Sequence, residues 1–280
     1  MKLYELENIK QILRHHNLWA KKGFGQNFLI NKDILDSILN AQEITKEDTI
    51  VEIGPGIGVL TKELAQKAKN VISVELDSDL LPVLAETLAD FNNIEIKNEN
   101  ALDFIPPKTP YKVIANIPYN ITSPLISHFL QNTHKPTEMT ILIQKEVAEK
   151  IISKQGKHTV LSIQNGLFGE ATIVKIVPNN SFYPEPKVTS AVINIKTFDK
   201  FHPNFTTPED AKGIIRLARI SFSNRRKKIV NGLRTLIPQA KLEVILDKLG
   251  IDKEIRPQAL SIPEWKMLNA KTSHFFSKQK

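Results

Sequence analysis

The sequence predicts an α/β fold with a mostly parallel sheet, followed by a small, all-helical C-terminal domain. Three observations carry this prediction. Between residues 49 and 143, short runs rich in β-branched residues alternate with segments of helical spacing, as in a parallel sheet covered by helices. Residues 211–280 show helical spacing alone. Hydrophobic residues make up 41% of the 280 residues and charged residues 24%, which are ordinary values for a globular protein.

The expected elements follow one another with clear breaks. The first 20 residues have the spacing of an amphipathic helix, and glycines break residues 21–31, so that 1–31 form an N-terminal helical arm. Further helices are expected over 32–40, 59–69, 80–88 and 124–130, and strands over 49–53, 71–75, 94–96, 111–115, 139–143, 171–177 and 190–195. Residues 197–210 are polar with several prolines and read as a linker. We therefore expect a first domain over 1–200 and a second over 201–280.

Composition excludes several classes of protein. The chain has no cysteine, which rules out a disulfide scaffold, a thiolate metal site and a cysteine nucleophile. No apolar run approaches the roughly 18–20 residues that span a bilayer, and the first 22 residues mix charged with apolar residues, unlike a signal peptide. We expect a cytoplasmic protein. The histidines show no metal-ligand spacing, so no metal is expected at His15, His16, His128, His134 or His158.

The net charge of +8 is concentrated at one end of the chain. Residues 201–280 hold 16 Lys and Arg against 7 Asp and Glu, whereas residues 1–200 hold 22 against 23. A basic segment on a neutral body indicates a polyanionic partner, with nucleic acid ahead of a membrane surface. The alternative is a basic face that only contacts solvent.

A glycine-rich turn and an acidic residue suggest a nucleotide-like cofactor. Gly54, Gly56 and Gly58 lie between an expected strand and an expected helix, where glycines let the backbone approach a ligand closely. The spacing differs from the G-x-G-x-x-G of dinucleotide binding, and the turn lacks the lysine of a P-loop. Glu75 ends the next strand, where a carboxylate can accept hydrogen bonds from both ribose hydroxyls. NAD and S-adenosylmethionine both fit these features.

The segment Asn116-Ile117-Pro118-Tyr119 favours S-adenosylmethionine. It follows the fourth expected strand, at the sheet edge where ligands of such folds bind. The exocyclic nitrogen of adenine is a poor nucleophile because its lone pair is delocalised into the ring. The side-chain oxygen of Asn116 and the carbonyl of Ile117 can each accept one of its N–H groups, Pro118 fixes the backbone, and Tyr119 offers a ring for stacking. Catalysis would then rest on positioning and polarisation. An ordinary turn is the alternative.

Taken together, the motifs resemble the ribosomal RNA adenine dimethyltransferases of the kasugamycin-resistance (KsgA) type. The likeness runs over nearly the whole chain and is carried by residues 25–29, 52–56, 74–75, 116–121, 144–148, 182–188, 222–228 and 256–261. It implies a Rossmann-like methyltransferase domain that uses S-adenosylmethionine. It also implies dimethylation of the N6 of two adjacent adenines, in a hairpin loop near the 3′ end of 16S rRNA. The expected partner is small-subunit rRNA within an immature 30S subunit, and the expected state is a monomer.

The resemblance also implies which residues bind the cofactor. They are Asn27, Leu29, Gly54, Gly56, Glu75, Asn100 and Asn116. The family usually has an Asp-Ala pair at the adenine contact, whereas this chain has Asn100-Ala101. An amide can accept a hydrogen bond as a carboxylate does, but it brings no charge. Asp103, three residues further on, is a possible substitute.

The residues expected to face RNA lie in two segments. Phe182 and Lys187 belong to a proline-rich loop. The rings of Phe182 and Tyr183 either stack on the target base, which the resemblance favours, or only pack the loop. The other segment is the basic run Arg225, Arg226, Lys227 and Lys228, which is expected to contact phosphates.

Three alternatives stay open at this level. The sister family of Erm-type resistance methyltransferases shares the Q-N-F and N-I-P-Y motifs but modifies large-subunit rRNA. A non-catalytic assembly factor could keep the same fold. An NAD-dependent oxidoreductase is disfavoured by the glycine spacing.

Overall fold

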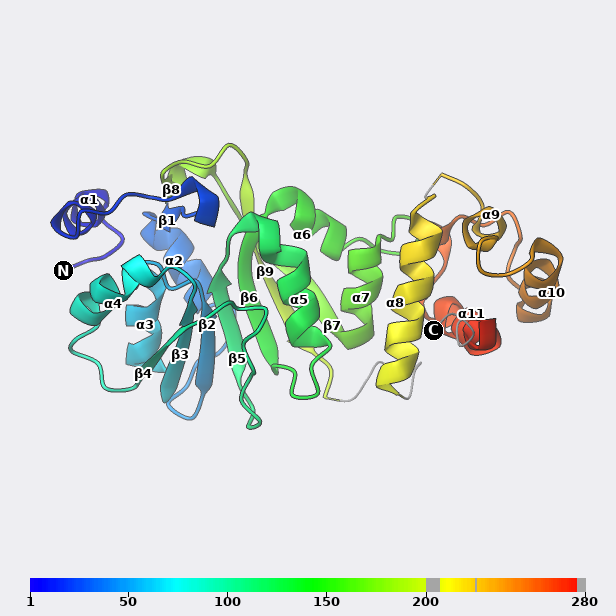
Figure 1. Ribbon diagram of the computed structural model, residues 1–280, viewed down its shortest axis with the longest axis horizontal. Helices are drawn as coiled ribbons and strands as arrows, with labels where there is room; N and C mark the ends of the chain where they lie inside the picture. Colours follow the sequence, from blue (N-terminus) through cyan, green and yellow to red (C-terminus); the bar gives the residue numbers. More distant parts are fainter. Residues whose placement is uncertain (200–206, 225, 276–280) are drawn as a thin grey trace. The chain divides into compact units, whose positions relative to one another are not determined.

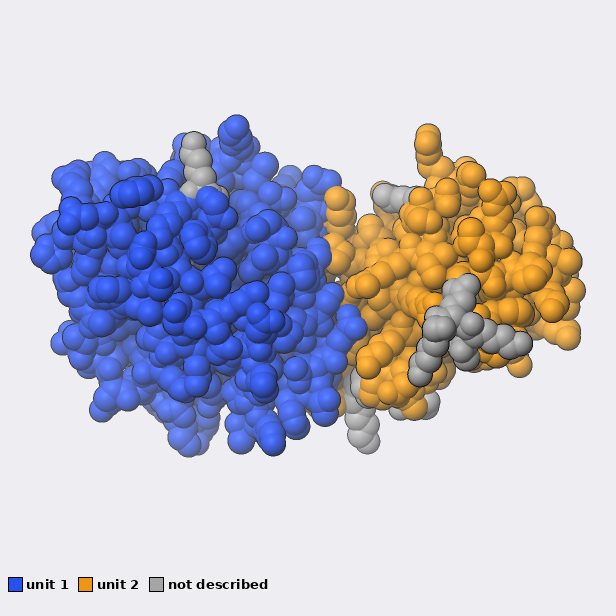
Figure 2. All heavy atoms as spheres, in the orientation of Figure 1, with its two compact units in different colours: residues 1–148, 171–197 blue, residues 149–170, 198–280 orange. Residues whose placement is uncertain are grey.

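The computed structural model describes residues 1–199, 207–224 and 226–275, and divides the chain into two compact units. Unit 1 comprises residues 1–148 and 171–197, and unit 2 comprises residues 149–170 and 198–280 (Figure 2). The sequence did not indicate that residues 149–170 group with the C-terminal segment. The expected boundary between residues 200 and 201 lies outside the described residues. No helix in the described parts of the chain is both long and apolar enough to cross a bilayer.

Unit 1 is built around a seven-stranded sheet in the order β4-β3-β2-β5-β6-β9-β7 (Figure 1). All five strands from β2 to β6 pair in parallel with their neighbours, and β9 runs antiparallel to β6. The strands are β2 (Thr49–Ile53), β3 (Asn70–Glu75), β4 (Ile94–Asn98), β5 (Lys112–Asn116), β6 (Glu138–Gln144), β7 (Gly169–Val177) and β9 (Ser190–Thr197). The prediction of a mostly parallel sheet is confirmed.

The central strands are buried on both faces because helices cover the sheet. In β6, residues 139–143 are all buried, as expected for an apolar strand between two helical layers. Helix α2 packs against α3 and β6, and α3 packs against β3. The helices of this unit are α1 (Leu6–His15), α2 (Lys32–Leu39), α3 (Val59–Lys67), α4 (Leu81–Thr87), α5 (Thr122–Leu130) and the start of α6 (Lys145–Ile151).

A small second sheet ties the N-terminal arm to the body of unit 1. Strand β1 (Phe28–Leu29) pairs antiparallel with β8 (Phe182–Tyr183). The amide of Ile30 extends this pairing by donating to the carbonyl of Ser181 at 2.8 Å. The sequence did not predict either strand, because two residues are too short for a periodic pattern. The N-terminal helix is also shorter than predicted, over Leu6–His15 rather than the first 20 residues.

Unit 2 is helical in its described parts. It contains α7 (Val160–Phe168), α8 (Pro208–Phe222), α9 (Ile229–Leu233), α10 (Gln239–Leu249) and α11 (Ile262–Thr272). Helix α8 packs against α7, α9 and α11, and the fully buried Trp265 stacks on Phe222 with ring centroids 6.4 Å apart. A capping box between Ser261 and Glu264 starts α11. The helical C-terminal domain predicted from residues 211–280 is confirmed, and α7 joins it from earlier in the chain.

Candidate active site

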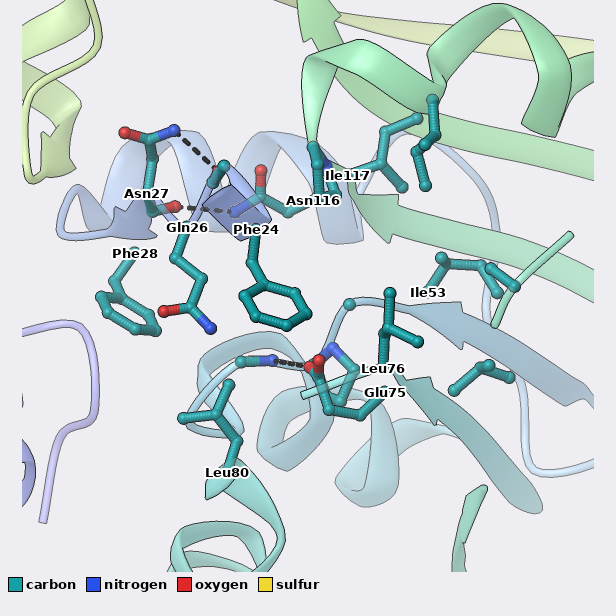
Figure 3. A pocket seen from close by; sticks show the side chains of 18 of the residues that line it. Phe24, Gln26, Asn27, Phe28, Ile53, Glu75, Leu76, Leu80, Asn116 and Ile117 are labelled. Carbon is teal, nitrogen blue, oxygen red and sulfur yellow. Dashed lines mark hydrogen bonds between the residues drawn. The ribbon is translucent and has the colours of Figure 1, made fainter. Parts of the chain in front are cut away.

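A cavity lies between β2 and β5, where the order of the parallel strands along the chain reverses. Strands β2 and β5 are neighbours, and Ile53 pairs with Ala115, so Gly54 and Asn116 follow side by side at the carboxyl ends. Ligands of open α/β sheets bind at this switch point. A cavity of about 250 Å³ opens there. Its lining comes from residues 23–29, 38, 53–56, 59–60, 74–76, 80, 99–101 and 116–121 (Figure 3).

The glycine turn needs glycine for two reasons. Gly54 and Gly56 have φ of 72° and 60°, in the left-handed region that other residues rarely adopt. A Cβ on Gly54 would lie 3.2 Å from the carbonyl oxygen of Asn116, and a Cβ on Gly56 would lie 3.3 Å from the ring of Phe28. Both side chains would fill space at the wall of the cavity. The turn therefore exposes bare backbone to whatever the cavity holds.

Glu75 presents a buried carboxylate to the same cavity. Only 7% of its surface is exposed. One carboxylate oxygen accepts from the amide of Gly56 at 3.3 Å (Figure 3), and the other accepts from the amide of Asp77 at 2.8 Å. Burial raises the pKa of Glu75, and the two backbone donors act in the opposite direction. Each oxygen keeps a lone pair, so the carboxylate can accept two further hydrogen bonds from a diol.

A second buried acid lies under the glycine turn. Glu52 is 1% exposed on β2, and the hydroxyl of Ser73 on β3 donates to it at 2.7 Å. Burial raises the pKa of Glu52 to about 7. Glu52 does not line the cavity. Glu52 lies on β2, two residues before Gly54, and its hydrogen bond with Ser73 joins β2 to β3 just before the turn.

Asn116 is held with its side chain across the cavity. Its amide group donates to the carbonyl of Asn27 at 3.4 Å, and the amide group of Asn27 donates to the carbonyl of Gly25 at 3.0 Å (Figure 3). These contacts use N–H groups, so the side-chain oxygen of Asn116 keeps its capacity to accept. Ile117 is 2% exposed and also lines the cavity. Two acceptor oxygens thus belong to consecutive residues that line the cavity: the side-chain oxygen of Asn116 and the carbonyl oxygen of Ile117.

Pro118 and Tyr119 complete this corner. Pro118 precedes the 3₁₀ turn η3 (Tyr119–Ile121), and both residues line the cavity. The hydroxyl of Tyr119 lies 2.6 Å from the hydroxyl of Ser190, the first residue of β9. Burial raises the pKa of Tyr119. The hydrogen bond to a fully buried serine fixes the direction of the Tyr119 ring.

The remaining predicted cofactor residues also lie at the cavity. Asn27, Leu29 and Asn100 line it together with Gly54, Gly56, Glu75 and Asn116, whereas Asp103 does not. The side-chain oxygen of Asn100 accepts from the amide of Leu102 at 3.0 Å. Its NH₂ group and one lone pair are left for a ligand. Asp103 is therefore not positioned as a substitute for Asn100.

Several lining residues were missed in the sequence. Phe24, Gln26, Leu76 and Leu80 face the cavity from the N-terminal loop and from the segment after β3 (Figure 3). Two of them could have been found from the sequence, because Gln26 is next to Asn27 and Leu76 is next to Glu75, both of which were predicted to bind the cofactor. Leu76 is an apolar residue with 56% of its surface exposed, as expected of a side chain that a flat ligand covers.

The residues predicted to face RNA differ in their surroundings. Arg226, Lys227 and Lys228 are exposed. Lys228, which directly precedes α9, forms an ion pair with Glu254. Lys187 is exposed in the loop between β8 and β9. Arg225 lies outside the described residues.

Phe182 does not match its predicted role. Its ring is 3% exposed and belongs to the core of unit 1, because β8 packs it inward beside Leu29. No ring face is open for stacking on a base. Tyr183, next to it, is half-buried, and Lys10 lies 5.9 Å from its ring centroid.

The fold brings one group of metal-ligand side chains together within the described residues. His15, His16 and Glu86 place their ligand atoms within 4.8 Å of one another at the surface. Sequence spacing could not show this, since Glu86 is 70 residues from His16. The absence of a metal stays a prediction.

Comparisons with known proteins agree with this geometry. The model of the family "Ribosomal RNA adenine dimethylase" matches residues 17–270. A protein of Clostridium botulinum named ribosomal RNA small subunit methyltransferase A is 38% identical over 270 residues, which cover 94% of this chain and 97% of that protein. A protein of the same name from Dehalococcoides mccartyi is 37% identical over 268 residues, covering 92% and 90%.

Two solved structures are also similar over most of their length. A dimethyladenosine transferase from Plasmodium falciparum has a TM-score of 0.75 at 27% identity, covering 89% of this chain and 98% of that one. The 23S rRNA methyltransferase ErmE has a TM-score of 0.70 at 27% identity, covering 88% and 100%.

Proposed function

The chain belongs to the ribosomal RNA adenine dimethylase family, and we propose that it transfers methyl groups from S-adenosylmethionine to the N6 of adenines in small-subunit rRNA. The observation that carries this proposal is the cavity itself. It holds a diol acceptor, Glu75, and a corner with two acceptor oxygens, Asn116 and Ile117, around one glycine turn. An assembly factor without activity would not need all three features.

The cavity suits S-adenosylmethionine in its chemistry. The turn at Gly54 and Gly56 leaves a cradle that a Cβ would fill, and the paired oxygens of Glu75 suit the two ribose hydroxyls. Apolar side chains such as Leu76 and Leu80 suit the flat faces of the adenine ring. When bound, the cofactor supplies an electrophilic methyl group. Asn100, whose side chain carries no charge, would contact the edge of the cofactor's adenine.

Catalysis by this chain's residues is mainly positioning. The side-chain oxygen of Asn116 and the carbonyl of Ile117 accept the two N–H groups of the target adenine, which turns the nitrogen lone pair out of the ring plane. Tyr119, fixed by Ser190, stacks on the base. No covalent intermediate on the protein is needed.

The same corner explains two rounds of transfer. After the first methyl group is added, the nitrogen releases one proton to solvent. One N–H remains, and one of the two acceptors can still hold it. After the second, no N–H remains and both acceptors lose their partner. Unpaired acceptors weaken the hold on the product, so the reaction stops at the dimethylated base.

The finer assignments of substrate and partner belong to the same proposal. The names of the relatives support the small subunit as the target. We place the methylation at two adjacent adenines in the 3′-terminal hairpin loop of 16S rRNA, within an immature 30S subunit. We place the protein in the cytoplasm and expect it to act as a monomer, with Arg226, Lys227, Lys228 and Lys187 on the RNA. Arg225 continues the same basic run.

A transfer assay tests the function. Purified protein is incubated with tritium-labelled S-adenosylmethionine and small subunits that lack adenine dimethylation, and the rRNA is mapped by mass. Label at two adjacent adenines, with up to two methyl groups on each, is expected. Label on large subunits only would indicate the function of the Erm-type enzymes. Absence of label on both subunits, with intact cofactor binding, would indicate an assembly factor.

A further inference from the structure

Residues 21–26, which we term the strap, form one wall of the cavity. Residues 23–26 line it directly, and Phe24 is 37% exposed (Figure 3). The strap is anchored at both ends. Before it, Leu18 and Ala20 pack against the core of unit 1, and after it β1 pairs with β8. Between these anchors, the strap needs its own contacts to stay against the cavity.

Those contacts converge on one buried carboxylate. Asp77 is 4% exposed and lies two residues after Glu75. One of its oxygens accepts from the ammonium group of Lys21 at 2.6 Å, and the other accepts from the side-chain amide of Gln26 at 2.7 Å. The backbone amide of Lys21 donates to the side-chain oxygen of Gln26 at 2.8 Å. The first and last residues of the strap are thus tied to each other and to Asp77.

One further contact strengthens this arrangement. Lys21 also pairs with Asp79 at 2.6 Å, so one ammonium group bridges two carboxylates. Hydrogen bonds to Asp77 and then to Asp79 raise the pKa of Lys21. A carboxylate as buried as Asp77 requires such a charged partner, and loss of that partner leaves an uncompensated buried charge.

Asp77 also contacts Glu75, the acid that faces the cavity. The backbone amide of Asp77 donates to Glu75 at 2.8 Å, while the Asp77 side chain holds the strap. Asp77 therefore contacts both Glu75 on one wall of the cavity and the strap on another. Lys21 and Gln26 reach it from more than 50 positions away in the sequence.

We propose that Asp77 and Lys21 are positioning residues for the cofactor, which hold the strap closed over it and keep Glu75 in place. The inference rests on the proposed use of S-adenosylmethionine. Opening of the Lys21–Asp77 pair lets the strap move away, which provides the route by which the product S-adenosylhomocysteine leaves. Neither side chain touches the reacting atoms.

Calorimetric titration with S-adenosylhomocysteine tests this role. We expect Lys21→Met and Asp77→Asn to weaken binding by roughly tenfold or more. Lys21→Met leaves the buried Asp77 carboxylate without its charged partner, and Asp77→Asn removes the charge that holds Lys21 beside the cavity. Lys21→Arg, which keeps the charge, is expected to restore most of the affinity. Lys32→Met is the matched control, since it removes the Lys32–Asp36 pair of 2.7 Å at a position that does not line the cavity. Its affinity should equal that of the wild type.

Limited proteolysis gives a second readout that does not depend on methyl transfer. Chymotrypsin cuts after aromatic residues, and Phe24 lies within the strap. We expect S-adenosylhomocysteine to slow cleavage at Phe24 in the wild type and in Lys32→Met. In Lys21→Met, cleavage should be faster and remain fast at saturating ligand.

The outcomes separate the two proposals. Wild-type affinity and wild-type protection in both Lys21→Met and Asp77→Asn would overturn the role of the pair. If Asp77→Asn fails to fold by circular dichroism, Lys21→Met alone decides, because its side chain lies nearer the surface. If the wild type itself does not bind S-adenosylhomocysteine, the proposed function fails rather than the role of the strap.

Discussion

The cavity of unit 1 and the basic run of unit 2 use charge in opposite ways. In unit 1, Glu75 at the cavity and Glu52, which does not line it, are buried acids with raised pKa values, and each is held by donors from a different strand or turn. In unit 2, Arg226, Lys227 and Lys228 are exposed bases in consecutive positions. Binding in the cavity would depend on the exact positions of single atoms, whereas binding by the basic run would depend on the total charge.

This difference predicts how each region responds to substitution. A buried group that loses a partner carries the full cost of desolvation, whereas an exposed charge is screened by water and salt. Single substitutions in the cavity should therefore have large, specific effects. Single substitutions in the basic run should have small effects that add up and that fall with salt. Four experiments can break or sharpen this contrast.

The largest effect is expected for Asn116→Ala. Loss of one polarising acceptor should lower turnover by about a hundredfold or more, a larger factor than any loss of cofactor affinity, while RNA binding stays nearly unchanged. Single-turnover kinetics on small subunits measures this, with calorimetry as the control for binding. A decrease of less than a few-fold would remove Asn116 from the role of holding N6.

Glu75→Ala should weaken cofactor binding by about 1.5–3 kcal/mol, or roughly 10–150-fold, because one carboxylate serves both ribose hydroxyls. Titration calorimetry with S-adenosylmethionine checks the value, and circular dichroism checks the fold. Unchanged affinity in a folded variant would mean that Glu75 is only a support for the glycine turn.

Glu52 should make stability depend on pH. Its pKa of about 7 in the folded protein exceeds the ordinary value of 4.5 that it has when unfolded, so the folded state holds its proton over the range between them. Stability is therefore lost as pH rises through this range. From about pH 5.5 to 7.5, the wild type should lose about 2 kcal/mol more than Glu52→Gln. Urea denaturation at several pH values measures this difference, and equal pH dependence would contradict a neutral Glu52.

The smallest effects per residue are expected in the basic run. Replacing Arg226, Lys227 and Lys228 by Ala should reduce the salt slope of subunit binding by about 2–3, and leave cofactor affinity unchanged. Lys241, Lys248 and Lys271 lie exposed elsewhere in unit 2 and provide a matched triple variant with the same loss of charge. Equal changes in both variants would show that only the net charge matters. Parallel slopes to the wild type would mean that the run contacts no phosphate.

Much of the fold could be predicted from the sequence because it depends on local patterns. The strand over residues 49–53 and the helix over 32–39 follow from apolar spacing and from breaks at glycine and asparagine. The two-residue strands β1 and β8 could not be predicted, because their only support is each other, about 150 residues apart. The assignment of residues 149–170 to unit 2 depends in the same way on partners such as α8 and α11.

The candidate site shows the same division between local and long-range information. The sequence by itself predicted the residues that line the cavity. Gly54 follows β2, and Glu75 and Asn116 end β3 and β5, at the sheet edge where ligands of such folds bind. Only the tertiary structure decided which side chains support them. Asp77 is hydrogen-bonded to Lys21 and Gln26, and Tyr119 to Ser190. These partners lie more than 50 positions away in the sequence. Burial of Phe182 was decided by packing against Leu29. The physical reason is that turns and strands are fixed by neighbouring residues, whereas burial and hydrogen-bond partners are fixed only when distant segments pack together.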